Sequence, residues 1–297
     1  MSWYIISANL FLTEIKLEVP LFNLRLTRKD RISNFRKIAL GTWKTTYDPS
    51  VYGTLEFRME KALSYIEAFR QKTGQRLTVT HLVVKAAAMT LKELPDINAI
   101  LRWNHIYLRK DIGVFFQVAM TDSSQDQLDL SGVTLYNVEQ KSLAEITAES
   151  QEKIEKVRSR TDPVLEKTRG AFQRVPSLLM PAVLKLISFL TYTLNFNLSR
   201  FGIPQDPFGS IMITNVGAMG LDIGYAPLVP YSRVPLLLAL GAVKDHPVVE
   251  NGQLAVGKVM KINATFDHRF IDGAHAVIIS KVLRNYLEDP FNHFDAV

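Results

Sequence analysis

The stretch FDHRFIDG, residues 266–273, decides how the rest of the chain is interpreted. Its histidine, His268, follows an apolar extended run, and the pattern His-x-x-x-Asp-Gly leads directly into a helical repeat. A neutral imidazole at such a junction can take a proton from a thiol or a hydroxyl near neutral pH. His268 is therefore the first candidate catalytic residue. Asp272 is expected to hold an arginine, to fix the loop that presents the imidazole, or to cap the helix that follows.

The elements around this stretch are mostly strands. A helix is expected over 273–287 and a strand over 257–266. Asn251-Gly252 is typical of a hairpin turn, here between strands at 247–250 and 253–256. Buried strands are expected over 209–216 and 234–243.

The first half of the chain mixes helices with strands. Residues 1–30 are interpreted as an N-terminal arm. Helices are expected over 31–45, from about 60 to 71 with Gly74 closing it, over 81–93 with Thr80 as N-cap, and over 141–160. Strands are expected over 51–59, 105–109, 112–120 and 131–137. This mixture predicts one α/β (mixed α+β) catalytic domain over 31–297.

The composition narrows the chemistry. The net charge of +6 comes without a long basic block, so a nucleic-acid partner is not expected. The sequence has no cysteine, which excludes disulfides, thiolate metal sites and a thioester formed on a cysteine of this chain. Acyl or thiol chemistry must then pass directly between two bound substrates. No secretory signal is recognised, and a cytoplasmic location is expected.

One apolar segment needs a separate interpretation. Residues 176–198 read PSLLMPAVLKLISFLTYTLNFNL, with Lys185 as their single charge. The length could span a bilayer, but Pro181, Lys185 and the polar final turns argue against it. We expect a buried or interface helix first and surface membrane contact second.

Four segments resemble the acyltransferase components of 2-oxo acid dehydrogenase complexes, such as dihydrolipoamide acetyltransferase and succinyltransferase. They are FDHRFIDGAHAVIISKVLRNYLEDP (266–290), FRKIALGTW (35–43), LTVTHLVVKAAAMTLKELPDINAIL (77–101) and GSIMITNVGAMG (209–220). Their order agrees with that family. The wider superfamily, which includes chloramphenicol acetyltransferase, shares the His-x-x-x-Asp-Gly pattern.

The resemblance implies a fold, an assembly and substrates. It implies a chloramphenicol-acetyltransferase-like two-layer sandwich with a mixed sheet and flanking helices. It also implies a homotrimer, or a multiple of three, with active sites between subunits. Coenzyme A would be a substrate, with an acyl group carried by a lipoyl or other carrier protein, and no metal would be needed.

The resemblance also implies roles for particular residues. His268 would be the general base that deprotonates the incoming thiol. Thr214 would donate a hydrogen bond to the oxyanion of the tetrahedral intermediate. Asp272 would orient the loop through an ion pair with Arg36, and Asn215 would shape the turn. Three of these residues also have a structural alternative. His268 could be a structural loop histidine, Thr214 a strand-end threonine bonded to the backbone, and Asp272 a helix N-cap.

Three departures from the family leave the substrate open. No lipoyl domain or peripheral-subunit-binding domain is recognised, so a lipoyl carrier is expected in trans. The family's substrate-channel strand is replaced by QLDLSGV (127–133). An apolar helical insert over about 161–205 could line an acyl pocket, pack between trimers or touch a membrane. A chloramphenicol-acetyltransferase-like O- or N-acyltransferase and a catalytically weak scaffold remain the alternatives.

Overall fold

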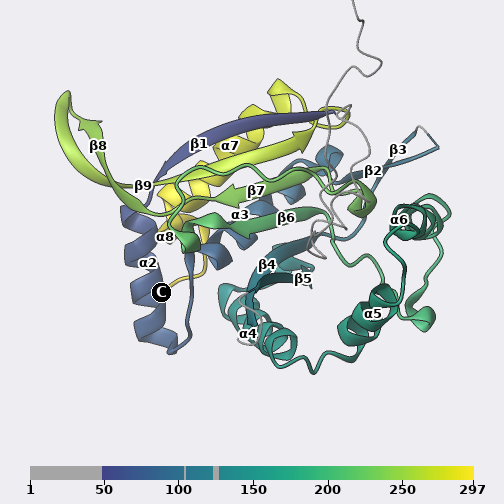
Figure 1. Cartoon of the computed structure of the whole chain (residues 1–297). Coiled ribbons are helices and arrows are strands. Elements are labelled where there is room, and N and C mark those ends of the chain that lie inside the picture. Colours follow the sequence, from purple (N-terminus) through teal and green to yellow (C-terminus); the bar gives the residue numbers. More distant parts are fainter. Residues whose placement is uncertain (1–48, 104, 123–126) are drawn as a thin grey trace, which may run out of the picture.

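The computed structural model describes residues 49–297, except residue 104 and residues 123–126. The strands of its main sheet are β1 (Ser50–Arg58), β4 (Gly113–Asp122), β5 (Gln127–Tyr136), β6 (Ile211–Asn215), β7 (Leu236–Leu240), β8 (Lys244–Glu250) and β9 (Gln253–Asp267). Their order is β1–β9–β7–β6–β4–β5, with β8 paired to β9 (Figure 1). The expected arm over 1–30, the expected helix over 31–45 and Arg36 lie outside the described residues.

The sheet is mixed because a single strand runs parallel to both of its neighbours. β6 pairs in parallel with β4 and with β7, while the other pairs are antiparallel. Hairpins join the antiparallel pairs β4–β5 and β8–β9, whereas the parallel pairs need long crossover connections. The connection from β5 to β6 contains α4 (Leu143–Arg158), α5 (Pro163–Gln173) and α6 (Met180–Ser188). The predicted mixed α/β fold is confirmed.

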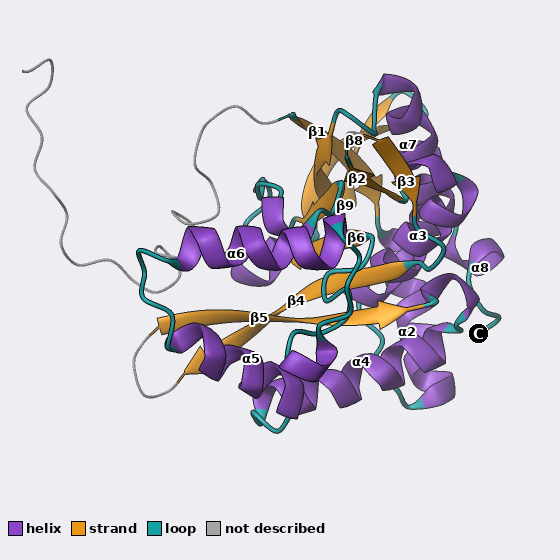
Figure 2. Ribbon diagram, turned by 90° about the vertical axis from the view of Figure 1, so that its right-hand side faces the viewer, coloured by secondary structure: helices purple, strands orange, loops and turns teal. Residues whose placement is uncertain are grey.

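Helices cover one face of the sheet and enclose the main core (Figure 2). They are α2 (Glu60–Thr73), α3 (Val79–Glu93), α4 and α7 (Gly273–Glu288). The short helix α8 (Pro290–His293) packs on α2 and α7. A separate hairpin, β2 (Ala99–Arg102) and β3 (His105–Leu108), projects beside α6.

The central strands are buried on both faces. Ile211 and Ile213 of β6 face the main core, whereas Met212 joins a smaller cluster with Leu237 and Ala239 of β7. Successive side chains of a strand point to opposite faces, so a strand covered on both sides must be apolar throughout. This explains why 209–216 and 234–243 could be predicted as buried strands.

The hairpin turn is where the sequence placed it. Asn251 and Gly252 have φ of 51° and 79°, the left-handed values that a two-residue hairpin turn requires. The expected boundary between strands 253–256 and 257–266 is wrong, since both stretches belong to the 15-residue strand β9. The first half of β9 pairs with β8, and the second half lies between β1 and β7.

Other boundaries also differ. The N-cap of α3 is Thr78, not Thr80, and the backbone N–H of Thr78 donates to Nδ1 of His81 at 3.2 Å. Thr78 and Thr80 are both residues that commonly cap helices. Thr78 is the cap because its backbone is extended, as an N-cap requires. β2 was not expected, and β5 begins at Gln127, not at residue 131.

The apolar segment 176–198 is not one long helix. It divides into α6 and a π-turn, η3 (Phe189–Thr193), with Pro181 in the first turn of α6. Among the described residues, no helix is long and apolar enough to cross a membrane. The segment is partly buried, with Met180, Leu184 and Tyr192 turned inward.

Candidate active site

The loop after β9 presents His268 between two residues that are firmly held. The buried carboxylate of Asp267 accepts hydrogen bonds from the Arg269 guanidinium at 2.6–3.1 Å and from its backbone N–H at 2.9 Å. This contact raises the pKa of Arg269. The backbone N–H groups of Asp267 and His268 donate to the carbonyls of Pro235 and Pro49, both at 2.9 Å. The clamp fixes the loop and leaves the His268 side chain exposed.

Asp272 is the N-cap of α7. Its carboxylate accepts from the backbone N–H of Ala274 at 2.9 Å and of His275 at 3.1 Å, and Nδ1 of His275 lies 2.7 Å away. The hydrogen bonds from His275 come first among the causes that lower the pKa of this carboxyl. The capping alternative is therefore present in the structure, and the proposed arginine partner, Arg36, lies outside the described residues. The cap fixes the start of the helix four residues beyond His268.

Thr214 and Asn215 end strand β6 at a turn that is held by side chains. Oδ1 of Asn215 accepts from the backbone N–H of Ala218 at 3.0 Å, and its Nδ2 donates to Oγ1 of Thr80 at 3.0 Å. Gly217 follows in close contact with the backbone just after β7, since a Cβ there would lie 2.4 Å from backbone atoms of Gly241. Asn215 thus shapes the turn, and Thr214 stands half-buried at its start.

The sheet register separates Thr214 from His268 within one chain. Thr214 lies opposite Ala239 of β7, which lies opposite Asn263 of β9. His268 follows Asn263 by five residues, a separation of roughly 17 Å along an extended strand. A hydrogen bond needs about 3 Å between heavy atoms, so these two side chains of one chain cannot meet on one carbonyl group. A site that uses both needs two copies of the chain.

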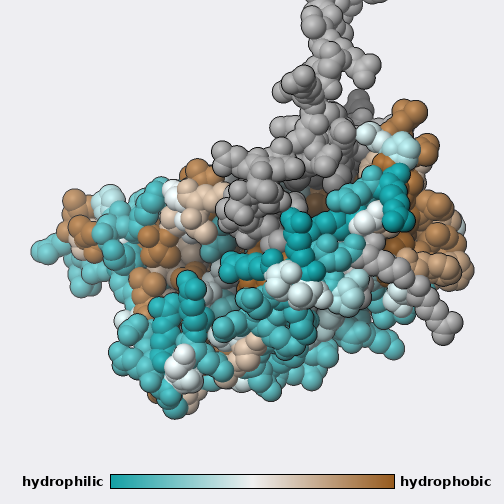
Figure 3. Space-filling view, turned by 60° about the horizontal axis from the view of Figure 1, so that its bottom comes forward, coloured by the Kyte–Doolittle hydropathy of each residue, from teal (hydrophilic) through white to brown (hydrophobic). Residues whose placement is uncertain are grey.

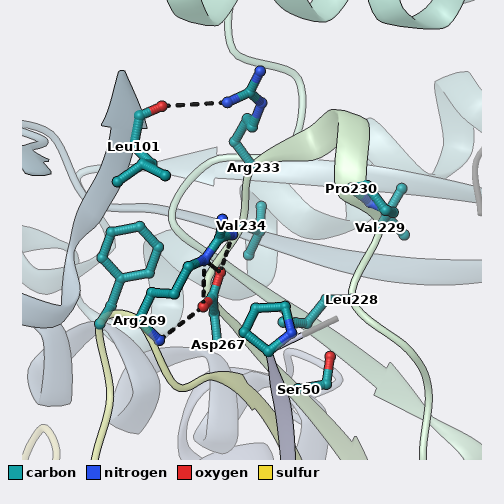
Figure 4. A pocket seen from close by; sticks show the side chains of 11 residues that line it. Ser50, Leu101, Leu228, Val229, Pro230, Arg233, Val234, Asp267 and Arg269 are labelled. Carbon is teal, nitrogen blue, oxygen red and sulfur yellow. Dashed lines mark hydrogen bonds and ion pairs between the residues drawn. The ribbon is translucent and has the colours of Figure 1, made fainter. Parts of the chain in front are cut away.

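A small pocket lies beside the histidine loop. It has a volume of about 190 Å³ and is bounded by Asp267 and Arg269 on one side and by Arg233 on the other (Figure 4). The remaining walls are mostly apolar and include Leu101, Leu228, Val229, Pro230, Val234 and Phe270. Asp267, the last residue of β9, lines this pocket, and His268 follows in the turn with an exposed side chain.

Arg233 was not singled out from the sequence. It stands in the left-handed region, with φ of 57°, and donates to Oγ of Ser188 at 3.1 Å and to the carbonyl of Leu101 at 3.2 Å. Nη2 of the same guanidinium donates to Oγ1 of Thr193 at 3.4 Å. Burial lowers the pKa of Arg233, and the nearby charge of Arg269 adds to this effect. The sequence pattern did not indicate this role, because an arginine in a loop that contains prolines is usually interpreted as solvent-exposed.

A comparison with known protein families matches residues 27–173 and 206–294 to the catalytic domain of the 2-oxoacid dehydrogenases acyltransferases. The chain belongs to this family. The resemblance seen in the sequence is thereby confirmed. Within the described part of the chain, no group of His, Asp and Glu side chains could hold a metal ion.

Curated relatives of this acyltransferase domain are distant in sequence. The dihydrolipoyllysine-residue succinyltransferase component of the 2-oxoglutarate dehydrogenase complex of Escherichia coli (strain K12) is 26% identical over 234 residues, which are 78% of this chain and 46% of that protein. The acetyltransferase component of the acetoin cleaving system of Bacillus subtilis is 23% identical over 220 residues, 74% of this chain and 44% of that protein. The chain spans about half the length of these relatives.

Solved structures of the family share the fold. The cubic core of a pyruvate dehydrogenase multienzyme complex has a TM-score of 0.64 and 21% identity, covering 90% of this chain and 93% of that one. The dihydrolipoamide acetyltransferase of Azotobacter vinelandii has a TM-score of 0.62 and 22% identity, covering 87% and 88%. The family match passes over residues 174–205, which contain α6 and η3. Ser188 and Thr193, two of the partners of Arg233, therefore come from a stretch that this match leaves out.

Proposed function

We propose that this chain transfers acyl groups between coenzyme A and the thiol of a dihydrolipoyl group, in a site shared by two copies of a homotrimer. His268 of one copy is the general base, and Thr214 of the other donates to the oxyanion. The observation that carries this proposal is the sheet register, which holds the two residues far apart within one chain. A fixed, exposed imidazole and a half-buried threonine are suited to meet across an interface.

The proposed reaction is a direct thiol exchange. His268 takes the proton of the coenzyme A thiol, and the thiolate attacks the carbonyl carbon of the acyl-lipoyl thioester. The tetrahedral oxyanion accepts a hydrogen bond from Thr214, an interaction worth about 3 kcal/mol in related acyl-transfer chemistry. The carbon–sulfur bond to the lipoyl group then breaks, and the leaving thiolate takes the proton from His268. No cysteine of this chain is needed as an acyl carrier.

The Azotobacter vinelandii acetyltransferase supports these roles. A serine, a histidine and an asparagine were investigated for their part in its catalytic mechanism, and the last two stand four residues apart. His268 and Asp272 have the same spacing here, and Thr214 precedes them as the serine does there. Threonine keeps the hydroxyl of serine, while Asp272 replaces an amide by a carboxylate that can still cap α7.

The test is an acyl-transfer assay with purified full-length chain. Acyl-coenzyme A and dihydrolipoamide are mixed with the protein, and release of the coenzyme A thiol is followed. His268→Ala should lower kcat by about 10²–10⁴-fold, the usual contribution of a general base. Thr214→Ala should lower kcat by about 10²–10³-fold. His246→Ala, in the distant strand β8, is the matched control and should keep full activity.

Other outcomes would replace this proposal. Thiol release only with hydroxyl or amine acceptors would indicate a chloramphenicol-acetyltransferase-like activity. No turnover with any acceptor, from a folded protein of trimeric mass, would indicate a scaffold. A native mass that is not a multiple of three would contradict the shared site.

A further inference from the structure

Helix α6 exposes a second apolar face in addition to the one that it buries. Met180, Leu184 and Ser188 turn toward the body of the protein. Leu186, on the opposite side of the helix, and Leu178, just before the helix, have 57% and 89% of their surface accessible. Leu179, Phe189, Phe196 and Phe201 of the same stretch are also exposed. A helix that is apolar on its outer side as well is expected to have a further partner.

The β2–β3 hairpin continues this surface. The rings of Trp103 and Phe189 meet edge to face at 5.9 Å, and Nε of Arg102 donates to the carbonyl of Thr193 at 3.1 Å. The hairpin itself exposes Trp103, Ile106, Tyr107 and Leu108. Figure 3 shows hydrophobic surface gathered on the side of the molecule where α6 and this hairpin lie. We call these exposed apolar residues of the stretch 178–201 and of the β2–β3 hairpin the apolar platform.

The charged residues within the two sequence stretches that form the apolar platform have one sign. From Lys167 to Gln205 the sequence contains no aspartate or glutamate, and its charged residues are Lys167, Arg169, Arg174, Lys185 and Arg200. Arg174 and Lys185 are exposed beside the apolar residues of α6. The stretch 102–110 likewise has no acidic residue, and Lys110 is exposed. Exposed apolar side chains with cations beside them are complementary to a surface that carries negative charge on its outside and is apolar below it.

The platform is anchored to the body of the protein. Arg109, at the end of the hairpin, forms an ion pair with Asp206, which follows the insert. Arg233 ties Ser188 and Thr193 to the carbonyl of Leu101. Residues 174–205 fall between the two segments of the family match, whereas the β2–β3 hairpin lies within the first segment.

We propose that the apolar platform docks this protein on the surface of anionic lipid bilayers. Leu178, Leu186 and Phe189 enter the headgroup region, and Lys185 and Arg174 contact acidic headgroups. Trp103 and Tyr107 match the preference of large amphipathic rings for the membrane interface. The contact that we propose is with the surface of the bilayer, and no helix among the described residues is long and apolar enough to cross it. A two-fold symmetric contact between copies fits the platform less well, because it would place cations against cations. A heterologous contact inside the proposed trimer is separated from the bilayer by the self-association outcome of the test.

The test is vesicle flotation with the full-length chain at low salt. Vesicles of pure phosphatidylcholine are compared with vesicles that contain phosphatidylglycerol as their anionic lipid. Binding to the anionic vesicles should be at least about tenfold stronger, since each cation near the surface contributes about fivefold. Leu178→Glu combined with Leu186→Glu should reduce that binding at least about tenfold. Lys185→Glu should reduce it at least about fivefold.

The matched control places the same change on another apolar surface. Val249 and Leu254 of the β8–β9 hairpin are 73% and 79% exposed, and Val249→Glu with Leu254→Glu should bind vesicles as the parent does. Equal binding by the α6 double variant, or no binding of the parent to anionic vesicles, overturns the proposal. Self-association of the parent that the α6 double variant loses, without vesicle binding, would assign the platform to a second copy. Acyl transfer in solution should be unchanged in both double variants, which separates this proposal from that of the activity.

Discussion

Thr214 and His268 lie toward opposite ends of one sheet, because β6 runs parallel to β7 and β7 runs antiparallel to β9. If two copies share each site, two inactive variants should complement each other. A Thr214→Ala chain still supplies His268, and a His268→Ala chain still supplies Thr214. Denaturing and refolding an equal mixture should restore about a quarter of the parent activity, since random trimers pair the intact residues in that share of sites.

The control for complementation is each variant refolded alone, which should stay inactive. Simple mixing without refolding should restore nothing while the trimers stay intact. An inactive refolded mixture with native mass and native circular dichroism would contradict the shared site.

His81 makes the stability of the fold depend on pH. It is buried in the first turn of α3, and this burial lowers its pKa to about 4 from an ordinary 6.5. Between these values the unfolded chain binds the proton more strongly than the folded protein, so stability falls as the pH decreases. The free energy of unfolding should drop by about 3 kcal/mol from pH 6.5 to pH 4 through this group. Well above pH 6.5 the group is neutral in both states and has no effect.

Urea unfolding at a series of pH values measures this dependence. His81→Gln keeps a side-chain acceptor at the third position of α3 but does not titrate, so it should flatten the slope between pH 4 and 6.5. His293→Gln, at an exposed position, should leave the slope unchanged. A slope that is the same in His81→Gln and the parent would refute the assignment.

The elements of the sheet could largely be predicted from local pattern. The Asn251-Gly252 turn and the apolar run of β7 depend on neighbours in the sequence, and local chemistry was sufficient for both. Local chemistry was not sufficient to choose between Thr78 and Thr80 as the N-cap of α3, because both residues are equally suited to that position. The separation of Thr214 from His268 could not be predicted either. It depends on how β6, β7 and β9 align, and no direct hairpin turn joins β6 to β7 or β7 to β9 to fix that alignment locally.

Asp272 should affect both the stability of α7 and the rate of acyl transfer. Asp272→Ala removes the acceptor for the N–H groups of Ala274 and His275 and should lower the Tm by a few degrees. Asp272→Asn keeps one acceptor oxygen and should cost less. Because the cap fixes the end of the loop that presents His268, kcat should also fall in Asp272→Ala. Thermal melts and the thiol-release assay measure the two effects.

The matched control for Asp272 is another N-cap. Ser142 caps α4 and accepts from the N–H of Glu145 at 3.2 Å, far from the histidine loop. Ser142→Ala should lower the Tm by a similar amount and leave kcat unchanged. An equal loss of kcat in both variants would mean that Asp272 acts only through global stability.

Arg109 and Asp206 should couple the apolar insert to the sheet. Only 11% of the Arg109 side chain and 29% of that of Asp206 are exposed, so removing one partner leaves a largely buried charge. Arg109→Met alone should cost about 3 kcal/mol in urea unfolding. Asp206→Asn together with Arg109→Met should recover much of that loss, because the stranded carboxylate is then neutral. If the losses of unfolding free energy in the two single variants simply added in the double variant, the pair would contribute nothing as a unit. In that case the rate at which a protease cleaves 174–205 should be the same in Arg109→Met as in the parent.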